Sequence, residues 1–178
     1  MELITSRLSL QPLSQRTMVA AIRTGDPCVC LGLPADKLTR EQRQMQRRVY
    51  TAKLQIGLRA PDAWLLCTSW QMVCRRTGEL VGEAGFKGPP RWGELEIGYS
   101  TRAAHRNRGY MTEAVQALCR YAFRQTIRRV EYVIATTRAD NLPSHRVLIK
   151  NGFLRAGERN GLLLWKLPGP NAPAAGPG

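Results

Sequence analysis

At residues 106–113 the chain reads Arg106-Asn107-Arg108-Gly109-Tyr110-Met111-Thr112-Glu113, between a strand-like run and a helix-like run. A basic, glycine-containing turn that opens directly into a helix presents unpaired backbone N–H groups at the positive end of the helix dipole. Arg106 and Arg108 add positive charge, and Gly109 lacks the Cβ that would keep a ligand away from the main chain. The turn therefore predicts a phosphate or pyrophosphate site, although an ordinary helix N-terminus with solvated arginines has the same pattern.

The segments around this turn alternate between strand and helix. Residues 94–100 form a strand-like run, and Gly98 within it is typical of a bulge or of a close backbone approach by a ligand. Residues 110–123 have a helix-like pattern, and residues 130–136 form a second β-rich run. A short helix follows, with Asn141 or the residue before it as its cap. The predicted order is strand, anion-binding turn, helix, strand, short helix, strand.

The rest of the chain has the pattern of an antiparallel meander with helices. The expected strands are residues 3–10, 64–76, 79–87, 152–158 and 161–167, and the expected helices are residues 14–24 and 39–59, separated by a loop at 25–34. Within the second helix, Met45, Val49, Ala52 and Ile56 form one apolar stripe.

Three sets of residues, taken in order, resemble the GNAT N-acetyltransferase superfamily, and within it the branch that acetylates the N-termini of ribosomal proteins. They are residues 4–13, Glu96-Ile97-Gly98-Tyr99 followed by Arg106-x-x-Gly109-Tyr110, and Asn141-x-x-Ser144-x-x-Val147-x-x-Lys150-Asn151-Gly152-Phe153. The resemblance implies an α+β fold, with a mixed, mostly antiparallel seven-stranded sheet flanked by helices on both faces. Residues 1–167 would form this single domain. Residues 168–178, rich in Pro, Gly and Ala, are predicted to be a disordered tail.

The resemblance also implies an acetyl-CoA-dependent N-acetyltransferase (EC 2.3.1 class), in which a primary amine attacks acetyl-CoA directly in a ternary complex. The implied cofactor-binding positions are Tyr99, Ser100 and Thr101 beside the pantetheine, Arg106, Asn107, Arg108, Gly109, Tyr110, Met111 and Thr112 around the pyrophosphate, and Asn141. Met111 departs from the family loop, which usually has Gly or Ala there. Its side chain must point away from the pyrophosphate, or cofactor affinity suffers. The early helices would form one wall of the acceptor cleft, or a lid that only covers the sheet.

Acyl transfer from a thioester to an amine needs a group that removes a proton from the amine, and stabilisation of the leaving thiolate. Glu96 matches the acidic residue of the family's strand and is the predicted base, with Glu94 and Glu83 as alternatives. Ser144 matches the serine of the family's helix and would protonate or hydrogen-bond the thiolate. The structural alternatives are a glutamate that pairs with arginine or faces solvent, and a Ser144 or Asn141 that only caps its helix.

The charge balance is strongly basic: 27 Lys and Arg against 13 Asp and Glu give a formal net charge of +14. Such a surface favours anionic partners, acetyl-CoA among them, and argues mildly against polycationic acceptors. Nucleic acid is a possible partner but is not favoured, because no basic patch interleaved with aromatic residues and no nucleic-acid-binding motif occurs.

Length and composition set the remaining bounds. A chain of 178 residues suits a single domain. It contains no apolar run of membrane-spanning length and no signal-peptide pattern, so we expect a cytoplasmic protein with no membrane partner. We expect the five cysteines to be reduced thiols, and the Cys28-Val29-Cys30 spacing does not suit zinc, so no metal is expected.

The favoured acceptor is a protein N-terminus, and a small amine comes next. Two alternatives from other classes are a non-catalytic acyl-CoA-binding module and a basic RNA- or ribosome-associated protein. Both a monomer and a homodimer are compatible with the sequence.

Overall fold

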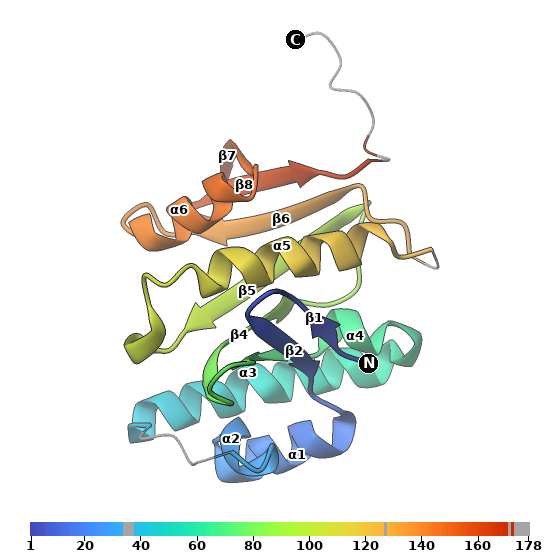
Figure 1. The fold of residues 1–178 in the computed structure, drawn as a ribbon. Coiled ribbons are helices and arrows are strands. Elements are labelled where there is room, and N and C mark those ends of the chain that lie inside the picture. Colours follow the sequence, from blue (N-terminus) through green and yellow to red (C-terminus); the bar gives the residue numbers. More distant parts are fainter. Residues whose placement is uncertain (34–37, 127, 171, 173–178) are drawn as a thin grey trace, which may run out of the picture.

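Figure 1 shows the fold as a computed structural model, which describes residues 1–33, 38–126, 128–170 and 172. One twisted sheet forms the centre of the molecule. Its strands are β1 (Leu3–Ile4), β2 (Leu8–Pro12), β3 (Trp70–Cys74), β4 (Leu80–Phe86), β5 (Glu94–Thr101), β6 (Tyr132–Thr137), β7 (Leu154–Arg159) and β8 (Leu162–Pro168). Their order in the sheet is β1-β2-β3-β4-β5-β6-β8-β7. Every neighbouring pair is antiparallel except β5 and β6, which are parallel.

Helices cover both faces of this sheet. They are α1 (Gln15–Thr24), α2 (Pro27–Cys30), α3 (Arg40–Arg59), α4 (Trp64–Cys67), α5 (Tyr110–Phe123) and α6 (Leu142–Lys150). On one face the Trp70 ring of β3 packs 5.4 Å from the Tyr121 ring of α5. On the other face Tyr50 of α3 donates a hydrogen bond to Glu83 of β4. The predicted α+β fold with a mixed sheet flanked by helices is confirmed.

The sheet has eight strands where seven were expected, because the predicted strand at residues 3–10 is broken. Thr5 N–H donates to the carbonyl oxygen of Leu8, which closes a tight turn and makes β1 and β2 a hairpin. The predicted strand at 64–76 starts only at Trp70, because residues 61–67 form a 3₁₀ turn and the short helix α4. The expected loop at 25–34 contains α2, which Asp26 caps.

The two sequence signals for helix termini that matter for the site are present. Thr39 and Gln42 form a capping box at the start of α3. Asn141 caps α6 through its side-chain oxygen, which accepts from Ser144 N–H.

The C-terminal strand β8 runs to Pro168, and Gly169 N–H still donates to the carbonyl oxygen of Glu131. The predicted disordered tail lies mostly outside the described residues, at 171 and 173–178. In the described part of the chain no helix combines the length and apolarity needed to cross a membrane. The five cysteines are free thiols.

Candidate active site

The basic turn at the start of α5 is exposed and is the candidate anion site. Asn107 and Gly109 adopt left-handed backbone angles, with φ of 60° and 76°. Among the described residues no side-chain hydrogen bond caps the start of α5, so its first-turn N–H groups can bind another partner. Arg106 and Arg108 are exposed beside them. The turn therefore has the backbone shape and the charge that a phosphate group requires.

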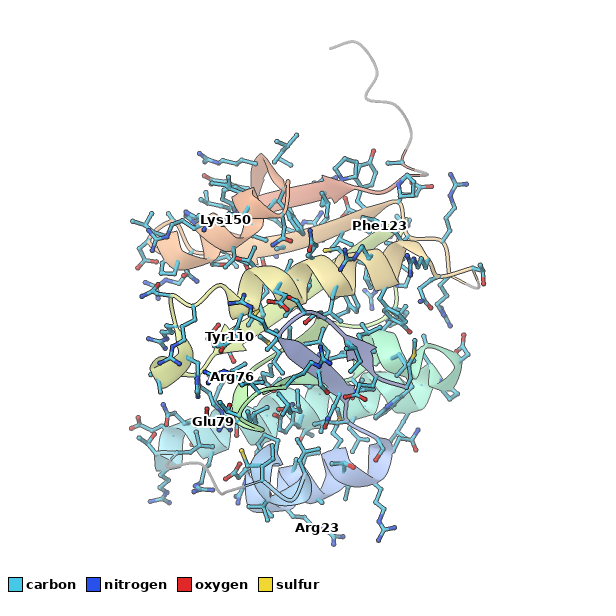
Figure 2. All side chains as sticks on the ribbon, in the orientation of Figure 1. Arg23, Arg76, Glu79, Tyr110, Phe123 and Lys150 are labelled. Atoms are coloured by element: carbon cyan, nitrogen blue, oxygen red, sulfur yellow. The ribbon has the colours of Figure 1, made fainter. Side chains whose placement is uncertain are left out.

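Arg7, at the β1–β2 turn, braces this loop from behind. Its guanidinium donates to the carbonyl oxygen of Arg108 at 2.9 Å and lies 4.9 Å from the centre of the Tyr110 ring. Figure 2 shows Tyr110 and Phe123 at the two ends of α5. The loop is thus fixed by a residue about a hundred positions earlier in the chain.

Glu113, in the first turn of α5, locks the helix to the same β1–β2 turn. Its carboxylate accepts hydrogen bonds from Thr5 Oγ1 at 2.6 Å, from Ser6 Oγ at 3.0 Å, and from Arg7 N and Nε at 2.8 and 2.7 Å. Burial opposes the charged form, but these bonds outweigh it and lower the pKa of Glu113 to about 2. The carboxylate is therefore ionised at any working pH.

Met111 does not fill the anion site. Its side chain is buried, only 5% exposed, in the hydrophobic core that also contains Ala114 and Leu118. The family-unlike methionine therefore points into the protein, away from the loop surface.

The parallel strands β5 and β6 separate after three residue pairs, which end at Glu96 and Ile134. The β4–β5 register runs without a shift through Gly98, so this glycine lies in a regular strand and the opening is on the β6 side. Glu96 O accepts from Lys87 N, just after β4, and Arg102 N donates to Val81 O of β4. Because backbone groups alternate in direction along a strand, those of Tyr99 and Thr101 point toward the opening.

On the α5 face of this opening, Tyr99 meets Ser144 of α6. The two hydroxyl oxygens are 2.8 Å apart. Burial raises the pKa of Tyr99 to about 12, partly offset by the bond to Ser144, so Tyr99 carries its proton at neutral pH.

A cleft of about 1030 Å³ lies between α3 and strands β4 and β5 and reaches the turn at Arg106. Its α3 wall includes Met45, Val49 and Ile56, which are 61%, 38% and 36% exposed. Its floor includes Glu83 and Ser100. The apolar stripe of α3 thus lines a cleft and does not pack into the core.

Residues 7–154 match the family model described as an acetyltransferase (GNAT) domain. The chain belongs to the GNAT acetyltransferase family. It is 41% identical over 88 residues to the uncharacterized N-acetyltransferase YjdG of Bacillus subtilis, a match that covers 48% of this chain and 51% of that protein. The chain spans about half the length of the curated relatives it matches.

Solved GNAT structures share the fold over almost the whole chain. RimL, a ribosomal-protein α-N-acetyltransferase in complex with coenzyme A, is similar with a TM-score of 0.66 at 17% identity, over 95% of this chain and 98% of that one. A ribosomal-protein-S5-alanine acetyltransferase from Vibrio fischeri has a TM-score of 0.66 at 15% identity, over 96% and 98%. At such identities the likeness concerns the fold. The acyl donor of the GNAT family is acetyl-CoA.

Within this GNAT fold the two glutamates of β5 are engaged in ion pairs. Glu96 Oε1 contacts Lys87 Nζ at 2.5 Å and accepts from Thr136 Oγ1 at 2.8 Å. Glu94 pairs with Lys166 and Arg159, which lower its pKa against the opposing effect of burial. Neither is among the cleft-lining residues. The base role of Glu96 stays a prediction.

Three contacts of the site lay beyond the sequence patterns, although Glu83 itself was an alternative base. Arg7 supports the loop, the Tyr99 hydroxyl reaches Ser144, and Glu83 faces the cleft with several donors around it. Each depends on contacts between residues far apart in the chain. Only the alternation within residues 80–86, which places Glu83 on the face opposite Leu80, Ala84 and Phe86, was a signal in the sequence.

Proposed function

We propose that this GNAT protein transfers acetyl from acetyl-CoA to a primary amine by direct attack in a ternary complex, with a protein N-terminus as the favoured acceptor. One observation carries the proposal: the cleft reaches Arg106, three residues before the N-cap Gly109 of α5, and its lining includes residues 98–101 of β5, beyond the last pair with β6. A phosphate-binding turn next to unpaired strand amides fits a long phosphorylated thioester.

The residues present fit coenzyme A in two places. Arg106, Arg108 and the amides around Gly109 would hold the diphosphate. The backbone groups of Tyr99 and Thr101 would face the pantetheine and the thioester carbonyl. Acetyl-CoA, when bound, supplies the activated acetyl group.

The remaining roles belong to side chains around that opening. Ser144, with the Tyr99 hydroxyl bonded to it, would hydrogen-bond or protonate the departing thiolate. Asn141 would contribute chiefly by capping α6 and so fixing Ser144. Two glutamates remain candidates to accept the amine proton: Glu96, from the sequence pattern, and Glu83, from its place in the cleft.

The acceptor preference is supported by likeness of fold to enzymes named for acetylating ribosomal proteins. A small amine is the second candidate, since the cleft is open to either.

An acceptor screen tests the proposal. Release of coenzyme A thiol from acetyl-CoA would be followed with short peptides that have free N-termini, with the same peptides N-acetylated as controls, and with small primary amines. We expect turnover with free amines only. Tight acetyl-CoA binding without turnover on any amine would favour a non-catalytic acyl-CoA-binding module. RNA affinity that falls steeply with salt and is unaffected by coenzyme A would favour the basic RNA-associated alternative.

A further inference from the structure

Glu83 is held in the cleft by donors that all bind one of its two carboxylate oxygens. Oε2 accepts from Tyr50 Oη at 2.7 Å, Ser69 Oγ at 2.9 Å and Gln71 Nε2 at 3.2 Å. In the described part of the chain Oε1 has no hydrogen bond. Tyr50 and Ser69 are buried, and burial together with the Glu83 carboxylate raises the pKa of Tyr50. These three donors therefore fix the orientation of the carboxylate, and its Oε1 is left for a ligand.

Two buried amide oxygens beside the cleft also have no hydrogen-bond donor within the described chain. Gln71 is 1% exposed, and its Nε2 donation to Glu83 fixes which way its amide points. Within the described chain its Oε1 has no hydrogen-bond partner, and neither has Oε1 of Gln46. Both residues line the cleft. A buried polar atom without a partner destabilises the protein, and a ligand with several N–H groups would remove that penalty.

The acceptors in this part of the cleft match an ammonium group. A primary ammonium has three N–H donors and one positive charge. Glu83 offers a charged acceptor, and Gln46 and Gln71 offer neutral ones. Glu96 accepts from Lys87 and Thr136, both through its Oε1, and unlike Glu83 it does not line the cleft.

Two lysines in the same cleft would repel a ligand that carries more than one positive charge. Lys53 Nζ donates to the carbonyl oxygens of Phe86 at 2.6 Å and Thr68 at 3.2 Å. Burial lowers the pKa of Lys53 to about 8, while the charge of Glu83 acts in the opposite direction. Lys87 also lines the cleft. A second ammonium on the acceptor would face these cations.

The opposite wall is apolar. Met45, Val49 and Ile56 present exposed side chains into the cleft from successive turns of α3. Covering exposed apolar surface of this kind with an apolar ligand is favourable, because it removes that surface from water. An amine carried on an apolar body would use this wall and Glu83 together.

We propose that the acceptor is a primary monoamine with an apolar body, for example a protein N-terminus whose first side chain is apolar. Its ammonium binds Glu83, and Glu83 takes the proton from it. The proposal rests on the proposed acetyl transfer and specifies its acceptor half-site.

The proton and electron balance is simple. The ammonium gives one proton to the Glu83 carboxylate, directly or through water, and the freed lone pair forms the N–C bond to the thioester carbonyl carbon. The C–S bond breaks, and its electron pair leaves with sulfur. The second amine proton ends on that thiolate, and Glu83 returns its own proton to solvent. The products are an amide, coenzyme A thiol and one proton.

The first test compares conservative glutamate variants. Glu83→Gln keeps the shape and removes the base, so we expect kcat to fall by about 100-fold or more, with coenzyme A affinity unchanged within about twofold. Glu83→Asp should recover part of the activity and is the fallback if the glutamine variant folds poorly. Glu79→Gln, on the exposed β3–β4 turn labelled in Figure 2, is the matched control.

Glu96→Gln serves as the rival variant. A loss in Glu96→Gln that exceeds the loss in Glu83→Gln, with both proteins folded, would overturn the proposal and restore Glu96 as the base. A larger loss in Glu83→Gln supports it.

The second test probes the apolar wall. With n-hexylamine against 1,6-diaminohexane, and with peptides that begin with leucine against aspartate, we expect at least about tenfold higher kcat/KM for the apolar member of each pair. Val49→Asp should erase that preference, whereas Val19→Asp, at an exposed position of α1 outside the cleft, should keep it.

Failure of the acceptor assignment and failure of the proposed acetyl transfer give different experimental results. Turnover on amines with no preference for apolar bodies, or one that survives Val49→Asp, overturns this inference and leaves acetyl transfer intact. No turnover on any amine by protein that binds acetyl-CoA overturns both.

Discussion

Gly109 is the residue on which the anion site depends most. Its φ of 76° is a conformation that side chains other than glycine adopt only with strain, and a Cβ there would lie 3.3 Å from Arg7 Nη2. The backbone of Gly109 therefore lies between the supporting Arg7 side chain and the exposed face of the turn.

Gly109→Ala is expected to weaken coenzyme A binding about tenfold or more, since the strain costs about 1–3 kcal/mol and the loop must shift to relieve it. Gly161→Ala is the matched control. It has a similar φ of 74° with open space around it, so it should lose comparable stability with no loss of coenzyme A affinity. Calorimetric titration of both variants checks this. Equal affinity in the two would mean that the loop does not hold the ligand.

The residues whose roles could be predicted from the sequence are those that belong to a local pattern. Gly109 and the arginines beside it follow from a turn before a helix, and the inward direction of Met111 was required if the loop binds a phosphate. Arg7 was assigned no role, and Glu83 was named only as an alternative base. Their partners are distant in the chain, and a side chain that reaches across a sheet leaves no periodicity in the sequence.

Helix α5 is the element that presents the site, and Glu113 ties it to the β1–β2 turn. The folded-state pKa of Glu113, about 2, lies below the ordinary 4.5. A depressed acid pKa means that the carboxylate stabilises the fold above about pH 4.5, and that this stability is lost as the pH falls toward 2.

Glu113→Gln should therefore lower the free energy of unfolding at pH 7 by about 1–3 kcal/mol, the cost of hydrogen bonds to a charged group. The difference in the free energy of unfolding between the variant and the wild type should become smaller as the pH falls from 4.5 to 2. Urea unfolding across that range measures it. Glu158→Gln, which removes an exposed ion pair with Arg155, should change little at any pH. A gap for Glu113→Gln that stays constant with pH would contradict the assigned pKa shift.

At the level of elements the helices with caps were predictable and the short apolar segments were not. The capping box of α3 and the cap of α6 are local signals. Residues 64–67 are apolar in a row, a pattern that fits a buried strand or a helix equally, and only packing made them α4. The apolar stripe of α3 was read correctly as amphipathic, but no pattern distinguishes a stripe that meets the core from one that lines a cleft.

For the whole molecule, the site is a product of topology. Parallel strands β5 and β6 diverge, α5 starts at one side of the opening, and α3 closes the cleft from the other face. The family resemblance predicted a pyrophosphate loop before α5 and early helices beside an acceptor cleft, whereas composition alone indicated only one basic domain. The charge of +14 draws anions to the entire surface, so binding of a polyanion becomes informative only when general attraction is separated from the site.

Calorimetric titration of the folded protein with coenzyme A and with pantetheine, which lacks the diphosphate, makes that separation at two salt concentrations. We predict one coenzyme A per chain, pantetheine at least about tenfold weaker, and a preference that persists at 0.15 M salt, where attraction between exposed charges is largely screened. Uptake of no coenzyme A by folded protein, or equal affinity for the two compounds, would contradict the assignment of the Gly109 turn as a diphosphate site.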